Sequence, residues 1–245
     1  MKPFDDPRVR RALTLAIDRW GGSKQLSRIA ILRSVGGVVF PGHALAATEE
    51  ELQEIAGYWP DLEKSRAEAR RLLREAGVPE GFTFKLHNRG VDQPYKIAGA
   101  WLINQWRSIG LNAKQCVQPS DLYFKTLRSH TSDFQVSIDY NCHSCPNPLL
   151  DVSKYISDDR ASNNFANYQD RVLDKLFDKM NRSTDATMQR QLMRQYEKRI
   201  LDEQAHMFVT LWWYRIIPHR SVVRGWKIGP SHHMNQDLGN VWLAQ

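Results

Sequence analysis

The sequence of 245 residues lacks any apolar run long enough to cross a membrane, because no stretch of about 18 consecutive apolar residues occurs in it. Its three cysteines are too few for a disulfide framework. Its 14 glycines and 11 prolines lie near background, which excludes collagen-like and low-complexity chains. A chain of this length buries enough surface to form a core without disulfides or metal. We therefore expect a globular protein with one large domain or two small ones.

Signatures of common enzyme classes are also missing. The chain has no glycine-rich phosphate loop, no GxSxG nucleophile elbow and no HExxH zinc motif. Hydrolase and nucleotide-binding functions therefore have no positive support in the sequence.

A cluster of one sign of charge is lacking too, although 34 Lys+Arg against 27 Asp+Glu leave a formal charge of +7. Between residues 63 and 75 arginines alternate with glutamates, as on a solvated helix face. No nucleic-acid reader motif accompanies the basic residues. We expect no nucleic-acid binding.

The chain begins Met1-Lys2 and enters a helix directly, with Asp6 as its cap and Pro7 in its first turn. No apolar export segment precedes this helix. Two interpretations stay open: a cytoplasmic protein, or a piece of a longer protein whose leader lies elsewhere.

Strands and helices alternate from residue 82, and this alternation predicts the fold class. Strands are expected at 82–86, 111–117 and 134–138, with helices striped by apolar residues between 98 and 109 and starting at Ser120. The order β-α-β-α-β predicts an α/β fold with a parallel sheet and right-handed crossovers. Shorter helices are expected at 24–33, from Thr48 to about 57, at 63–76, and around 172–180 and 192–200.

Parallel sheets bind ligands outside the carboxyl ends of their strands. That rule selects three loops, 88–95, 118–121 and 139–148, and within the first two of them Asn88, Arg89 and Gln118 as candidate ligand-binding residues. The alternative is that these loops are plain connections. The aromatic run from Met207 to Tyr214 is extended and has little local reason to fold on itself. We expect it to pair with a sheet, for which a part of the protein outside this chain is one source.

Cys142-His143-Ser144-Cys145 has the CxxC spacing of redox dithiols, zinc sites and short-loop disulfides. A structural zinc needs two further ligands, and no second CxxC or paired histidine spacing supplies them. Three alternatives stay open for Cys142 and Cys145: a local disulfide, free thiols, or a thiol–disulfide redox enzyme that uses the pair.

One known family shares motifs along nearly the whole chain. Residues 3–19, PFDDPRVRRALTLAIDR, resemble the signature "PFDDxRVRxALxxAIDR" of the periplasmic solute-binding proteins of ABC importers, family 5, the oligopeptide- and dipeptide-binding type. Further similar stretches are residues 67–77, 102–110, 167–176, 190–203, 223–226 and 236–243.

The resemblance implies a fold, a function and a location. It implies a type II, cluster C binding-protein lobe, with residues 1–205 forming the second, substrate-facing lobe and residues 206–245 returning to complete the first. It also implies a non-enzymatic monomer without cofactor or metal. Such a protein binds a peptide or related small solute in the periplasm and delivers it to an inner-membrane ABC permease. Related members also take nickel, haem, opines or sugars, so the ligand class stays open.

Peptide-specific members pair an aspartate after the third strand with the ligand's α-ammonium, in a stretch similar to "ADY". Ile138-Asp139-Tyr140 matches that stretch, and it opens the third loop selected above. The resemblance therefore adds Asp139, Tyr140 and Asn141 to the candidate binding residues. This chain then departs from the family's "xDP" or "NEP" turn, with residues 142–148 reading CHSCPNP, which alters the expected pocket wall.

Overall fold

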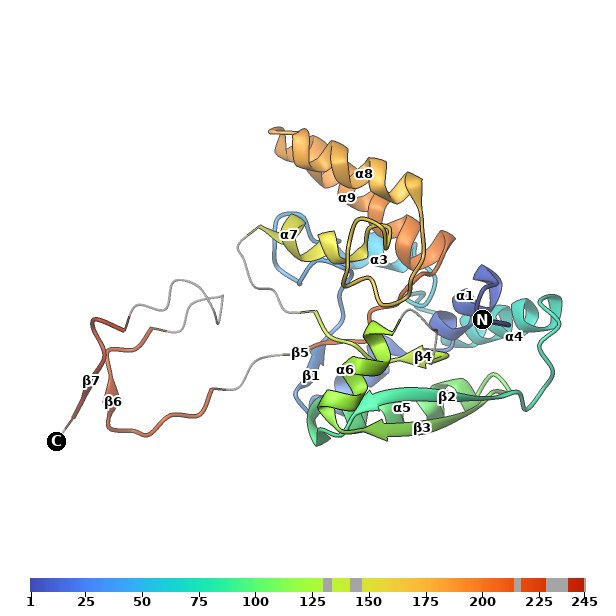
Figure 1. Cartoon of the computed structure of the whole chain (residues 1–245), viewed down its shortest axis with the longest axis horizontal. Coiled ribbons are helices and arrows are strands. Elements are labelled where there is room, and N and C mark those ends of the chain that lie inside the picture. The colour runs from blue at the N-terminus through green and yellow to red at the C-terminus, as the bar shows by residue number, and fades with distance from the viewer. Residues whose placement is uncertain (130–133, 142–146, 214–216, 228–237, 245) are drawn as a thin grey trace.

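The computed structural model describes residues 1–129, 134–141, 147–213, 217–227 and 238–244. Figure 1 shows a body of helices around a small parallel sheet, with helices α8 and α9 at one side of it and a long arm that carries strands β6 and β7 away from it. Within the described ranges, no helix is long and apolar enough to span a membrane.

The sheet has the predicted parallel topology. Strand β2 (Thr83–Arg89) lies at its centre and pairs in parallel with β3 (Asn112–Gln118) and with β4 (Val136–Ser137). Helix α5 (Ile97–Arg107) connects β2 to β3, and α6 (Ser120–Arg128) precedes β4. In Figure 1, α5 lies behind the sheet and α6 in front of it. The predicted β-α-β-α-β order is confirmed, although β4 is shorter than the expected strand.

One face of the sheet packs on a hydrophobic core. The core joins β2 to α5 and to two long-range partners, α1 (Pro7–Leu15) and α4 (Leu62–Glu75). Trp106 of α5 is fully buried at its centre and donates its indole N–H to the carbonyl of Leu13 at 3.0 Å. The side chain of Asp6 caps α1, as expected, by accepting from the backbone N–H of Arg8.

The helix expected at 24–33 is wrong in its bounds. Helix α2 runs instead over Arg19–Leu26, because the side chain of Asp18 accepts from the backbone N–H of Gly21 and starts the helix earlier. Residues Leu32–Ser34 form strand β1. Leu32 is buried opposite Trp213 of strand β5 (Trp212–Trp213), which pairs antiparallel with β1. Part of the aromatic tail thus finds its strand partner within this chain.

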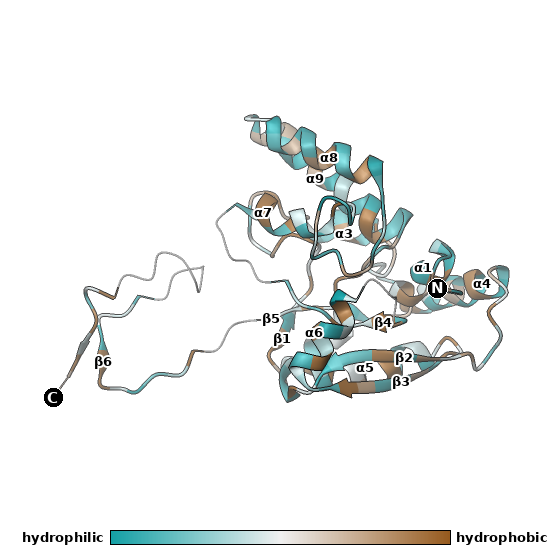
Figure 2. Ribbon diagram, in the orientation of Figure 1, coloured by the Kyte–Doolittle hydropathy of each residue, from teal (hydrophilic) through white to brown (hydrophobic). Residues whose placement is uncertain are grey.

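A second apolar cluster holds the remaining helices. It contains α7 (Pro148–Val152), α8 (Arg171–Arg182) and α9 (Ala186–Lys198), with the single-turn helices η2 (Ser153–Tyr155) and η3 (Arg199–Glu203). Hydrophobic and hydrophilic residues alternate along α8 and α9 (Figure 2), as is typical of amphipathic helices. The predicted capping box of Thr48 and Glu51 is confirmed and opens α3 (Glu49–Gln53).

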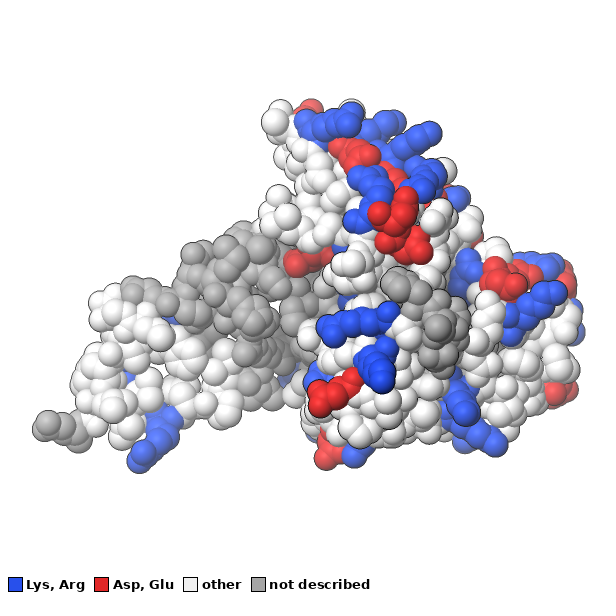
Figure 3. Space-filling view, viewed as in Figure 1, with Lys and Arg blue, Asp and Glu red and all other residues white. Residues whose placement is uncertain are grey.

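Acidic and basic side chains are interspersed on the outer helices (Figure 3). Arg171 pairs with Asp159 at 2.8 Å and Arg160 with Asp178 at 2.7 Å on and beside α8. The arm consists of β6 (Val223–Arg224) and β7 (Trp242–Leu243), which pair antiparallel.

A buried guanidinium ties three segments of the body together. Arg19, only 1% exposed, donates to the carbonyl of Gly57 at 2.6 Å, to the carbonyl of Val209 at 2.8 Å and to both oxygens of Thr14. It also lies 4.4 Å from the ring centre of Tyr58, and burial lowers its pKa. The stretch that follows η3 is therefore anchored to the N-terminal helices.

We expect Arg19→Met to lower the free energy of unfolding by about 3 kcal/mol or more, because buried carbonyls lose their donors at a cost of about 1–3 kcal/mol each. Urea denaturation measures the change. Arg74→Met, at an exposed position of α4, is the control and should change stability by no more than about 0.5 kcal/mol. An unchanged midpoint for Arg19→Met would contradict this role.

Candidate ligand-binding cleft

The carboxyl ends of the three parallel strands meet at one edge of the sheet. Arg89 stands opposite Gln118 in the β2–β3 register, and the backbone N–H of Gly90 donates to the carbonyl of Gln118 at 2.6 Å. On the other side, the N–H of Ile138 donates to the carbonyl of His87 at 2.9 Å and directs the next residue, Asp139, past the same edge. The described parts of the three predicted loops therefore lie together.

A cleft of about 1870 Å³ opens at this edge. It is larger than the roughly 300–1,000 Å³ of common small-molecule pockets. The sheet edge supplies one side of it, and helices and the segment after η3 supply the others. The lining includes charged, amide and aromatic side chains, among them Arg89, Tyr95, Asp139, Tyr140, Asn141, Lys154, Phe165 and His206.

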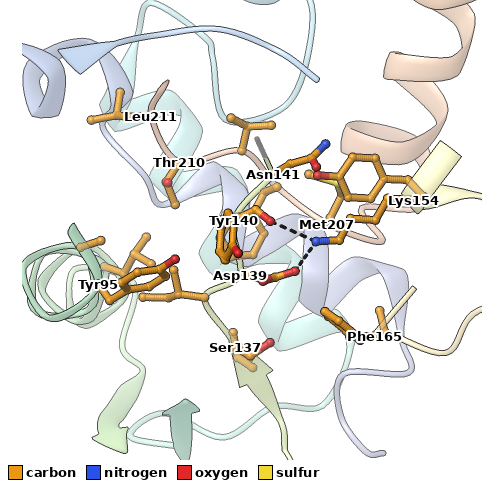
Figure 4. Close-up of a pocket in the computed structure, with 18 of the residues that line it drawn as sticks. Tyr95, Ser137, Asp139, Tyr140, Asn141, Lys154, Phe165, Met207, Thr210 and Leu211 are labelled. Carbon is orange, nitrogen blue, oxygen red and sulfur yellow. Dashed lines mark hydrogen bonds and ion pairs between the residues drawn. The ribbon is translucent and has the colours of Figure 1, made fainter. Parts of the chain in front are cut away.

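Asp139 forms an ion pair with Lys154 of η2 within the cleft. The ammonium of Lys154 also donates to the carbonyl of Tyr140 at 3.1 Å, and Figure 4 shows it directed at both groups. The two side chains are 22% and 14% exposed. Sequence reasoning missed Lys154, because a single lysine in a short helix carries no signal of a partner 15 residues earlier.

Tyrosines surround the Asp139 carboxylate. Burial raises the pKa of Tyr95 to about 12, and burial likewise raises the pKa values of Tyr123 and Tyr155. The negative charge of Asp139 contributes to all three increases. The hydroxyl of Tyr123 donates to the carbonyl of Ile138 and steadies the chain next to Asp139. These phenols therefore stay protonated at neutral pH.

Arg89 faces the cleft from an aromatic cage. Its guanidinium carbon lies 5.1 Å from the ring centres of Tyr95 and Phe124 and 5.9 Å from that of Tyr140. It donates to the hydroxyl of Ser120 at 3.1 Å and to that of Tyr95 at 3.3 Å. Within the described ranges no carboxylate pairs with the Arg89 guanidinium. The wall of the cleft therefore carries an ordered positive charge.

The other candidates from the first two loops lie at the same edge but outside the cleft lining. Asn88 is fully buried, and its amide N–H donates to the carbonyl of Arg89 at 2.9 Å. Gln118 donates to the hydroxyl of Thr126 at 3.3 Å. The cleft thus brings together Arg89, Asp139, Tyr140 and Asn141 of the six predicted residues, and ligand contacts by all six stay predictions.

The amide of Asn141 donates to the carbonyl of Asp151 at 3.0 Å, which fixes it against α7. Cys142 and Cys145 lie outside the described residues. Cys116, in β3, is a free thiol. Among the residues that the structure describes, no three His, Cys, Asp or Glu side chains gather as metal ligands.

A histidine lines the cleft where the chain leaves η3. The ring of His206 stacks on Tyr168 with centroids 3.8 Å apart, and its Nε2 lies 3.2 Å from a carboxylate oxygen of Asp170. Burial lowers the pKa of His206 to about 4, and the positive charges of Arg10 and Arg199 act in the same direction. Its neutral form therefore prevails at neutral pH.

Residues 1–163 match the family described as "Bacterial extracellular solute-binding proteins, family 5 Middle". The chain belongs to this family. The resemblance seen in the sequence motifs is thus confirmed. Family 5 consists of solute-binding proteins, so membership gives no support to the thiol–disulfide redox alternative for Cys142 and Cys145.

Curated relatives of this family 5 chain are described as dipeptide-, di/tripeptide- or glutathione-binding proteins. Di/tripeptide-binding protein 1 of Pseudomonas aeruginosa is 29% identical over 233 residues, which cover 94% of this chain and 41% of the relative. The glutathione-binding protein GsiB of Salmonella typhimurium is 38% identical over 100 residues, which cover 38% of this chain and 16% of the relative. The chain therefore spans less than half the length of these relatives.

Solved structures of binding proteins share the fold. The Helicobacter pylori periplasmic binding protein DppA, in complex with the peptide STSA, matches with a TM-score of 0.79 at 20% identity, over 100% of this chain and 45% of that one. Haemophilus influenzae OppA, in complex with RPPGFSPFR, matches with a TM-score of 0.78 at 20% identity, over 100% of this chain and 47% of that one. The predicted binding-protein fold is confirmed.

The low pKa of His206 predicts how the stability of this family 5 chain depends on pH. The ordinary pKa of a histidine side chain is 6.5. Between pH 6.5 and about 4, the unfolded chain therefore binds a proton at this ring and the folded chain does not. The free energy of unfolding should therefore fall as the pH is lowered through this window, by up to about 3 kcal/mol.

His206→Phe keeps a ring on Tyr168 and removes the titration, so it should flatten this dependence in urea denaturation between pH 4 and 6.5. His219→Phe, at an exposed position, should retain the wild-type slope. Equal slopes for the wild type and His206→Phe would show that His206 is not the titrating group.

Proposed function

We propose that this chain forms one side of the ligand cleft of the substrate-binding component of an ABC importer, and that the ligand is a short peptide. The observation that carries the proposal is the pair of fixed opposite charges, Asp139 and Arg89, in one cleft at the carboxyl edge of a parallel sheet. A short peptide presents an ammonium at one end and a carboxylate at the other, which these two groups complement.

Asp139 is the partner of the peptide's ammonium. Removing an ammonium from water without a counter-charge costs several kcal/mol, so a cleft that closes around it needs a fixed anion. Asp139 meets this need because two hydrogen bonds hold the adjoining backbone in place. One runs from the backbone N–H of Ile138 to the carbonyl of His87, and the other from the hydroxyl of Tyr123 to the carbonyl of Ile138.

Arg89 is the partner of the peptide's carboxylate. A planar guanidinium binds a carboxylate with two parallel hydrogen bonds, and it does so at the lowest entropic cost when the arginine is already ordered. The ring contacts with Tyr95 and Phe124 and the bond to Ser120 supply that order.

We further infer the division of the chain. Residues 1–205 correspond to the second lobe of a two-lobed protein. Residues 206–245 leave this lobe, with β5 still paired to β1, and return to complete the first lobe. The exposure of Trp242 (59%) and Leu243 (69%) on the projecting arm supports this division, because large apolar side chains are normally covered by a partner surface. The two lobes then close on the ligand by a hinge motion.

The proposed setting is the periplasm. There the intact protein, a monomer without enzymatic activity, delivers its peptide to an inner-membrane ABC permease. The description of family 5 as extracellular solute-binding proteins and the names of the peptide-binding relatives support this setting.

Asp139→Asn should lower the affinity of the intact gene product for its peptide by about 100-fold or more, since truncating one member of a desolvated charge pair costs about 2–5 kcal/mol. A thermal-shift screen of di- and tripeptides finds the ligand, and isothermal titration calorimetry measures the affinity. Glu80→Gln, at an exposed position between α4 and β2, is the control and should bind as the wild type does. Wild-type affinity in Asp139→Asn would refute the role of Asp139.

Arg89→Gln should lower the affinity for a peptide with a free carboxylate by about tenfold or more, because a charge-assisted bidentate contact is lost. The same peptide with a C-terminal amide should bind the wild type weakly and should bind Arg89→Gln no worse than the free acid does. If the wild type bound the acid and the amide with equal affinity, Arg89 would not be the partner of the peptide's carboxylate.

A further inference from the structure

Asp139 is already paired before any ligand arrives. Lys154 forms an ion pair with its carboxylate, donates to the carbonyl of Tyr140 at 3.1 Å and lies 5.3 Å from the ring centre of Phe165. Both charged side chains are largely shielded from water, at 14% and 22% exposure (Figure 4). Lys154 is therefore an ordered part of the cleft wall, unlike a lysine in an exposed and mobile surface pair.

This pairing changes what the cleft can bind well. A simple N-terminal ammonium that approaches Asp139 meets a carboxylate already neutralised by one cation, and it places a second cation beside Lys154. Two neighbouring positive charges repel each other strongly where water is excluded. A ligand that also brings a carboxylate next to its ammonium removes this repulsion, because its carboxylate pairs with Lys154 while its ammonium pairs with Asp139.

We propose that Asp139 and Lys154 together recognise an amino-acid end whose ammonium and carboxylate sit on the same carbon, and that Lys154 determines this specificity. The chemical class is a peptide linked through a side-chain carboxyl group, as in a γ-glutamyl peptide, which leaves the α-carboxylate of its first residue free. This inference rests on the proposed function and names the substrate class of the same cleft.

The charges at this edge fit that class. Arg89 and Lys154 against Asp139 leave one net positive charge. A γ-glutamyl dipeptide with an uncharged second residue carries one ammonium and two carboxylates, and so one net negative charge. Its second carboxylate is then available to Arg89. An ordinary neutral dipeptide leaves the positive charge of the cleft uncompensated.

Two isomers test the proposal in the intact gene product by isothermal titration calorimetry. γ-Glu-Ala has its ammonium and a carboxylate on one carbon, whereas α-Glu-Ala has the same composition and net charge but carries that carboxylate at the end of its side chain. The wild type should bind γ-Glu-Ala about tenfold or more tightly than α-Glu-Ala. Lys154→Met should abolish the preference and bind α-Glu-Ala more tightly than the wild type does, because Asp139 then stands unpaired.

Lys154→Arg keeps the positive charge and should retain the preference, and Lys175→Met, at an exposed position of α8, should leave it unchanged. Equal or reversed affinities in the wild type would overturn the inference, as would a preference that survives in Lys154→Met. If other peptides bind and neither isomer does, the inference fails and peptide binding stands. If no peptide binds, both fail.

Discussion

Parallel pairing of β2 with both of its neighbours determines where this protein can hold a ligand. Because the three strands run in one direction, their carboxyl ends meet, and the segments that follow them must leave the sheet at one edge. Arg89, Ser120 and Asp139 come from three different segments and reach one region for this reason alone. An antiparallel strand at either position would send one of these segments to the opposite edge.

Two of the arginines, Arg19 and Arg89, lie in contrasting environments. Arg19 is enclosed by carbonyl and hydroxyl oxygens of its own chain, and its hydrogen bonds join α2 to α1, to Gly57 and to the segment after η3. Arg89 is held mainly by aromatic rings and hydroxyls, which order the guanidinium without neutralising it. The first environment stabilises the fold, and the second keeps a positive charge ready for a ligand.

Much of the fold could be predicted because its signals are local. Asp6 before Pro7, the Thr48–Glu51 capping box and the alternation of strand and helix after residue 82 each depend on neighbours in the sequence. The residues of the binding site were harder to predict, because only every second side chain of a strand points to one face of the sheet. That alternation buries Asn88 and leaves Arg89 at the cleft. The ion pair between Lys154 and Asp139 joins residues that only the fold brings together, so no local sequence pattern predicts it.

A crystal structure of the intact gene product with a bound peptide would show which residues of the cleft hold the ligand. We predict that the peptide lies at the carboxyl edge of the β3-β2-β4 sheet, with its ammonium within hydrogen-bond distance of the Asp139 carboxylate. A peptide bound elsewhere, or one bound at this edge whose ammonium has no contact with Asp139, would contradict it.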